Sequence, residues 1–152
     1  MLTQETIRSL NQLTRVCRDG EEFCRVSSAR AAGGDLRGLL RERSEEWGRL
    51  GDELQALVLL LGGEPATSGT AVARFRRAWL GMRAALMGPT DAALIDQWRR
   101  VHGEALRSYA EAMSGYFPER IRRTVGLQTD RIADRLDEIG GLEVRAAHSP
   151  GA

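Results

Sequence analysis

Acidic and imidazole side chains, the residue types of a carboxylate metal centre, occur on the core side of several predicted helices. Glu21 follows Cys17 by four residues and precedes Cys24 by three, so it shares a helical stripe with the two cysteines. His102 follows Trp98 by four residues and is expected to face the core in the same way. Carboxylates with a single imidazole suit Zn²⁺, Mn²⁺ or Fe²⁺. The candidate metal-ligating residues are Glu21, Glu46, Glu53 and His102.

A complete carboxylate-bridged di-iron centre is not encoded in the sequence. Such a centre takes one Glu from each of two helices and a Glu-x-x-His pair from each of the other two. No Glu-x-x-His occurs, and the second histidine, His148, lies in the predicted tail. We therefore predict a buried hydrogen-bonded layer in which His102 pairs with Glu21 and Gln128 bridges them, because buried polar groups must be paired. No cofactor is expected on this interpretation, and iron or manganese bound by the four candidates is the alternative.

Other kinds of active site have no support in the sequence. Cys17 and Cys24 are separated by about 10 Å along a helix, which is too far for a disulfide, and we predict two buried thiols. No Gly-x-Ser-x-Gly, GxGxxG or Walker-type motif occurs. The basic cluster over 74–77 (RFRR) has the pattern of one charged helix face, so no nucleic-acid site is expected.

Charge and hydropathy exclude several partner classes. The 22 basic and 21 acidic residues give a formal net charge of +1, so no long-range field attracts nucleic acid or anionic lipid. The longest apolar run, over 56–61, is far shorter than the roughly 20 residues that a membrane-spanning helix needs. The N-terminal segment lacks the basic start and apolar core of a signal peptide. We therefore expect a cytoplasmic protein without nucleic-acid or membrane partners.

Glycine and proline divide the chain into amphipathic segments with helical periodicity. Long helices are predicted over 3–30, 35–61, 90–113 and 118–139, and a shorter helix over 70–87. The predicted fold is all-α: a ferritin-like four-helix bundle with an additional short helix in the crossover between bundle helices two and three. A five-helix orthogonal array is the main rival. The bundle is expected to comprise residues 1–141, and residues 142–152 are expected to form a flexible tail after Gly140-Gly141.

Four stretches of the chain carry a family resemblance when they are taken together. They are 10–22 (LNQLTRVCRDGEE), 53–65 (ELQALVLLLGGEP), 67–79 (TSGTAVARFRRAW) and 105–113 (ALRSYAEAM), which contains Tyr109. The chain resembles a bacterial family of small single-domain ferritin-like proteins catalogued as a domain of unknown function. The resemblance extends from about Leu10 to Ile139, and its most specific part is the RDGE run combined with the GGEP connector. It implies a ferritin-like bundle with a crossover helix, and it brings no assigned activity.

The sequence departs from the pattern of that family at two places. The third bundle helix reads QWRRVHGEA over 97–105, where family members tend to carry a carboxylate-rich run, so His102 stands where a Glu is expected. The last helix lacks a His that family members often carry, and Leu136 is nearest to its place. Both departures concern groups that can bind a metal.

Three functions are consistent with these features. The favoured hypothesis is a non-enzymatic bundle that acts through protein association in a stress or housekeeping setting. Val58 and Leu59 widen the apolar arc of the second helix, which predicts burial beneath the crossover helix or against a second subunit, and hence a homodimer. The alternative is a ferritin-like metal binder with oxidase or storage-type activity. Nucleic-acid binding through the 74–77 cluster is the third hypothesis, and it predicts affinity that falls steeply with salt.

Overall fold

Four long helices make up the part of the chain that the computed structural model describes, residues 2–69 and 90–148. They are α1 (Leu2–Arg30), α2 (Gly34–Leu60), α4 (Asp91–Met113) and α5 (Glu119–Ala147). No strand occurs among these residues, so the predicted all-α four-helix bundle is confirmed. The additional short helix predicted over 70–87 lies outside the described residues.

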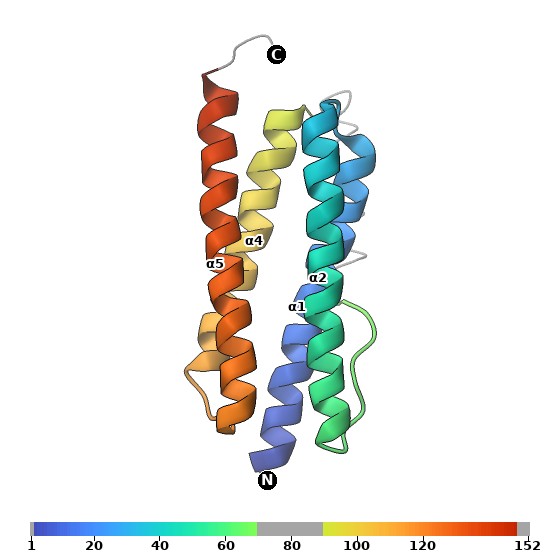
Figure 1. The fold of residues 1–152 in the computed structure, drawn as a ribbon, viewed down its shortest axis with the longest axis vertical. Coiled ribbons are helices and arrows are strands. Elements are labelled where there is room, and N and C mark those ends of the chain that lie inside the picture. The colour runs from blue at the N-terminus through green and yellow to red at the C-terminus, as the bar shows by residue number, and fades with distance from the viewer. Residues whose placement is uncertain (1, 70–89, 149–152) are drawn as a thin grey trace.

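The helices form two antiparallel hairpins, α1 with α2 and α4 with α5 (Figure 1). The end of α2 and the start of α4 lie at opposite ends of the bundle, so these two helices run in the same direction (Figure 1). α1 packs most extensively against α2, α4 packs against α5, and α1 also packs against α4. This is the connectivity of a bundle with one long crossover connection between its second and third helices.

Each helix buries one apolar stripe in a shared core, as the 3.6-residue periodicity predicts. The largest fully buried side chains are Leu10, Leu13, Phe23, Leu40, Leu54, Val58, Leu94, Trp98, Tyr109, Val125, Ile132 and Ile139. The outer faces of the helices carry charged residues. None of the described helices contains an apolar stretch long enough to cross a membrane.

The start of α4 is tied to the turn between α1 and α2. The side chain of Thr90 caps the helix by accepting a hydrogen bond from the backbone N–H of Ala93 at 3.1 Å. The carboxylate of the next residue, Asp91, accepts hydrogen bonds from the backbone N–H groups of Ala32 and Gly33, each at 2.9 Å. The predicted start of this helix at Thr90 or Asp91 is therefore confirmed, and the start of α4 is fixed against the first hairpin.

Two predicted helix ends are wrong. Asp35 lies in the first turn of α2, and Gly33 occupies the N-cap position with an extended backbone. The carboxylate of Asp35 still lies where it favours the helix dipole. α5 continues through residues 140–141 and ends six residues later, because Leu142 packs against the core. A glycine inside a helix costs only about 1 kcal/mol relative to alanine, which such packing offsets.

Two buried glycines allow α1 and α2 to approach closely. A Cβ atom on Gly20 would lie 2.6 Å from Cε2 of Trp47, and one on Gly51 would lie 2.9 Å from Cζ of Arg18. Both distances are shorter than van der Waals contact. The indole of Trp47 and the guanidinium of Arg18 therefore lie directly over the backbone of the neighbouring helix.

We predict that Gly20→Ala lowers the free energy of unfolding by about 1–3 kcal/mol, because the new methyl group overpacks against Trp47. Gly103→Ala is the matched control, since Gly103 is also inside a helix and a Cβ atom added there would meet no atom within 4 Å. The control should be neutral or stabilising by up to about 1 kcal/mol through helix propensity. Urea denaturation of both variants measures the two effects, and equal stabilities would contradict the close approach.

Candidate functional site

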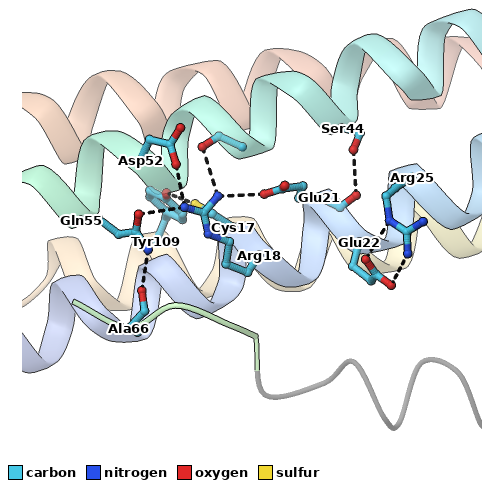
Figure 2. Close-up of polar contacts among 11 residues, drawn as sticks. Cys17, Arg18, Glu21, Glu22, Arg25, Ser44, Asp52, Gln55, Ala66 and Tyr109 are labelled. Carbon is cyan, nitrogen blue, oxygen red and sulfur yellow. Dashed lines mark hydrogen bonds and ion pairs between the residues drawn. The ribbon is translucent and has the colours of Figure 1, made fainter. Parts of the chain in front are cut away.

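A chain of hydrogen bonds crosses the core and connects all four described helices. Cys17 Sγ of α1 lies 3.1 Å from Tyr109 Oη of α4 (Figure 2). The hydroxyl of Tyr109 donates to Gln128 Oε1 of α5 at 2.7 Å, and Gln128 Nε2 donates to the backbone oxygen of Leu50 of α2 at 3.3 Å. Because the Tyr109 proton is used toward Gln128, the thiol of Cys17 is the donor to the phenol oxygen. We call Cys17, Tyr109, Gln128 and the Leu50 carbonyl the core chain.

The members of the core chain are uncharged at neutral pH. Burial raises the pKa of Cys17 to about 12. Burial also raises the pKa of Tyr109 well above its usual value. A protonated thiol is a poor nucleophile, so the arrangement holds helices in register and has no group that is ready for acid–base or nucleophilic chemistry.

His102 is buried in the core of the bundle and is neutral. Its Nε2 lies 2.9 Å from the backbone oxygen of Ile132, and because a carbonyl only accepts, Nε2 carries the proton. The ring makes an edge contact with Trp47, with ring centroids 5.2 Å apart. Burial lowers the pKa of His102, although the hydrogen bond to Ile132 and the charge of Glu46 oppose this shift.

The predicted pair of His102 and Glu21, bridged by Gln128, is not formed. Glu21 Oε2 instead accepts a hydrogen bond from Arg18 Nη1 at 2.8 Å (Figure 2). Gln128 is buried as predicted, but its partners are Tyr109 and Leu50. The position of Glu21 at the edge of its helical stripe lets its side chain turn outward to the guanidinium.

Arg18 joins α1 to α2 at the edge of the core. Its Nη2 donates to Asp52 Oδ1 at 2.7 Å and to Gln55 Oε1 at 3.0 Å, in addition to the contact with Glu21 (Figure 2). Gln55 Nε2 in turn donates to the backbone oxygen of Ala66 at 2.7 Å. We call Arg18, Glu21, Asp52 and Gln55 the Arg18 cluster. Glu53, the predicted candidate next to Asp52, is exposed and belongs to no buried layer.

Glu46 is held by arginines of α5. The side chain is buried, and its two carboxylate oxygens accept from Nε and Nη2 of Arg135 at 3.0 and 2.9 Å. Burial alone would raise the pKa of Glu46, but the hydrogen bonds from Arg135 and the charges of Arg135, Arg43 and Arg131 outweigh it and lower the pKa. Arg43 and Arg135 also bind Glu138, which extends the network between α2 and α5.

The four candidate metal ligands are thus not brought together. Within residues 2–69 and 90–148, no three His, Cys, Asp or Glu side chains gather as a metal-binding group. The oxygens of Glu46 are bound by Arg135, and Glu21 is bound by Arg18. These donors do not fit a carboxylate centre as they stand, and an iron or manganese site on them stays a prediction.

Periodicity did not identify Tyr109 as a polar partner of Gln128, or Cys17 as a partner of Tyr109. It placed both on core stripes, as an aromatic and a small apolar side chain. A signal was present, because the hydroxyl of a buried Tyr almost always needs a hydrogen-bond partner. A Tyr and a Gln on the core stripes of consecutive helices therefore indicate a shared hydrogen bond.

A family model matches most of the chain. The model of a family described as "Domain of unknown function (DUF2383)" matches residues 5–115, which include nearly all of α1 and the whole of α2 and α4. No curated protein matches the chain. The matched residues contain the Arg18 cluster and three members of the core chain, Cys17, the Leu50 carbonyl and Tyr109, whereas α5 with Gln128 follows the match.

We predict that Tyr109→Phe lowers the free energy of unfolding by about 1–3 kcal/mol, because it leaves Gln128 Oε1 buried without a donor. In the double variant Tyr109→Phe/Gln128→Leu both partners are apolar. Its free energy of unfolding should therefore fall by less than the sum of the decreases in the two single variants. Denaturation of the four proteins in a double-mutant cycle measures the coupling. Strictly additive losses would contradict the hydrogen bond.

We predict that the chain loses stability as the pH falls below 6.5, and that His102 contributes to this loss. The pKa of His102 is lowered in the folded state, so its contribution is complete above the unfolded value of 6.5 and is lost as the pH falls toward the folded value. The loss approaches about 1.4 kcal/mol per pH unit for one such group. The charged groups that act on His102 are Glu46, Arg135 and Arg43.

His102→Gln is the control for the pH dependence, since Gln keeps a donor for the Ile132 carbonyl and does not titrate. Urea denaturation between pH 7.5 and 5 should show a steeper loss for the parent chain than for the variant. His148 is present in both proteins and cancels from the comparison. Parallel pH profiles would show that His102 is not buried in its neutral form.

Proposed function

The chain belongs to the family described as a domain of unknown function (DUF2383), and we propose that it is a ferritin-like helical bundle acting through protein association rather than catalysis. The association that we propose is a homodimer. The observation that carries the proposal is a group of exposed apolar side chains at one end of the bundle.

This apolar end is formed by residues from three parts of the chain. The start of α1, the end of α2 and the connection between α4 and α5 lie at the same end of the bundle (Figure 1). Each contributes large apolar side chains that are more than half exposed: Leu2, Leu59, Leu60 and Tyr116. We infer that these side chains contribute to one interaction surface, because contiguous exposed apolar patches are typical of protein interaction sites. Leu59, for which burial was predicted, is 63 % exposed in the single chain, which favours burial against a second subunit.

The interior of the bundle supports association over catalysis. The thiol of Cys17 and the phenol of Tyr109 are protonated and hydrogen-bonded to each other. The carboxylate of Glu46 is bound on both oxygens by Arg135. A general base or nucleophile needs a group whose pKa and access suit its task, and these groups are paired instead.

The ferritin-like part of the proposal rests on the connectivity of the helices. α1, α2, α4 and α5 run up, down, down and up in Figure 1, with the long connection between the second and third. Ferritin-like folds have one such crossover, whereas simple up-down-up-down bundles have short loops only.

A cytoplasmic location completes the proposal. The two cysteines, Cys17 and Cys24, are free thiols in the core. Free thiols are typical of proteins in reducing compartments, where disulfides are rare. The balanced charge of the chain is also that of an ordinary cytosolic domain.

Metal binding with oxidase or storage-type activity is the alternative proposal. Its support is the neutral His102 in the core, whose Nδ1 has no hydrogen-bond partner among the described residues. It requires that Arg135 releases Glu46, which removes a buried ion pair. Elemental analysis of the purified chain separates the two proposals, because a stoichiometric transition metal favours the alternative.

We predict that the parent chain sediments as a dimer and that Leu60→Glu shifts it to a monomer, because the new charge would be buried in the interface. Val144→Glu is the matched control, since Val144 is similarly exposed at the opposite end of the bundle and should leave the dimer intact. Both changes lie on the surface, so the melting temperature of the monomeric fold should hardly change.

Sedimentation velocity over a hundredfold range of concentration measures these states. The proposal would be refuted if the parent chain stays monomeric at every concentration and if no partner protein is recovered with it from a lysate. Equal dissociation by both variants would place the interface elsewhere.

A further inference from the structure

The solvent-facing side of α5 carries charged side chains in an unusual order. α5 runs along one side of the bundle (Figure 1), and its buried residues, among them Ile121, Val125 and Ile132, face the other helices. Exposed residues that follow one another at alternating spacings of three and four form one stripe on the opposite side. The members of this stripe, which we call the outer stripe, are Arg120, Arg123, Leu127, Asp130, Asp134 and Asp137.

The outer stripe is divided into a basic half and an acidic half. Arg120 and Arg123 lie in the first two turns of α5, and the three aspartates follow Leu127. This order is unfavourable for the helix alone, because basic groups near a helix N-terminus oppose its dipole and like charges three or four residues apart repel. The ion pairs of α5 with the described residues use other side chains, namely Arg131, Arg135, Glu138 and Glu143. No ion pair within the described part of the chain therefore compensates the outer stripe.

The outer stripe is complementary to itself when a second α5 lies against it in the opposite direction. The alignment that places Arg120 opposite Asp137 of the second copy also places Arg123 opposite Asp134, because both steps along the stripe are three residues. A two-fold axis repeats each of these pairs. Like charges that repel along one helix are thus each opposed by a charge of the other sign.

Leu127 lies where the charge of the outer stripe changes sign, and it is 66 % exposed. In the antiparallel alignment, the two copies of Leu127 lie on either side of the two-fold axis. They are separated by three residues along the helices, or about 4.5 Å. The apolar side chains therefore meet at the centre of the contact, between the charged pairs.

We propose that the outer stripe of α5 binds a second copy of this chain, with the two α5 helices antiparallel about a two-fold axis. The Arg–Asp pairs set the direction and register of the contact. This surface is different from the apolar end, and the contact does not depend on the dimer proposed there.

The contact is expected to depend strongly on salt. Exposed ion pairs contribute little stability each and are screened by dissolved ions. The Debye length is about 30 Å at 0.01 M salt and about 8 Å at 0.15 M, so the contact should form at the lower ionic strength. A formal net charge of +1 leaves little overall repulsion between two copies under these conditions.

Sedimentation velocity of Leu60→Glu isolates the α5 contact, because this change disables the apolar end. We expect the variant to be monomeric at about 0.15 M salt and to dimerise at about 0.01 M, with a Kd at least about tenfold lower. A variant that stays monomeric at the lower ionic strength would overturn the inference. Failure of the proposed function is a separate result, namely a parent chain that stays monomeric at the higher ionic strength.

Charge reversal tests the antiparallel alignment. Arg120→Asp/Arg123→Asp and Asp134→Arg/Asp137→Arg, each added to Leu60→Glu, oppose like charges and should each abolish the low-salt dimer. An equimolar mixture of the two proteins should dimerise again, because every opposed pair is once more Arg with Asp. Aspartate in the first turns of a helix favours its dipole, so the first reversal should not lower the melting temperature.

Arg41→Asp/Arg49→Asp, added to Leu60→Glu, is the matched control. It makes the same change in net charge as the first reversal, at exposed positions of α2. The low-salt dimer should therefore be retained. Loss of the dimer in this control to the same extent as in the reversals, or a mixture that stays monomeric, would overturn the pairing of the two stripes.

Discussion

The buried hydroxyl of Tyr109 is the constraint on which the arrangement of the four helices depends. Its proton goes to Gln128 of α5 and its oxygen accepts from Cys17 of α1, while Gln128 reaches the backbone of α2 at Leu50. A slip of any helix by one residue, about 1.5 Å along its axis with a turn of about 100°, breaks these bonds inside the core. Apolar packing supplies most of the stability, and this uncharged chain selects one register among the many that packing alone would allow.

Charged groups surround the core chain and do not enter it. Arg18 binds α1 to α2 on one side, and Arg135 binds α2 to α5 on the other. The two stretches of the most specific family resemblance meet at the first of these places. Asn11 of the first stretch holds the backbone of Glu64 and Ala66, and Gln55 of the second stretch binds both Arg18 and Ala66. These residues therefore have structural roles at the contact between α1, α2 and the residues that follow α2.

The sequence predicted the helices well and the partners of the polar residues poorly. Helical periodicity tells which side chains face inward, and glycine and proline mark most of the ends, so the four-helix bundle was accessible. Which residue lies across from which depends on the register between helices, and periodicity carries no information on it. Glu53 and Asp52 are adjacent, yet the roughly 100° between them decides that Asp52 meets Arg18. The prediction for Glu21 failed for a different reason, because the guanidinium of Arg18, three residues earlier on the same helix, binds its carboxylate.

The α1–α2 hairpin presents the attachment points for both ends of the crossover. Residues after α2 are held by Asn11 and Gln55, and Asp91 at the start of α4 is held by the turn at Gly33. All of these holding groups lie in or beside a hairpin whose contacts are local in sequence, and local contacts form before distant ones. Because contacts that are local in sequence cost less loop-closure entropy than distant ones, both ends of the crossover are held by the part of the fold that is easiest to form.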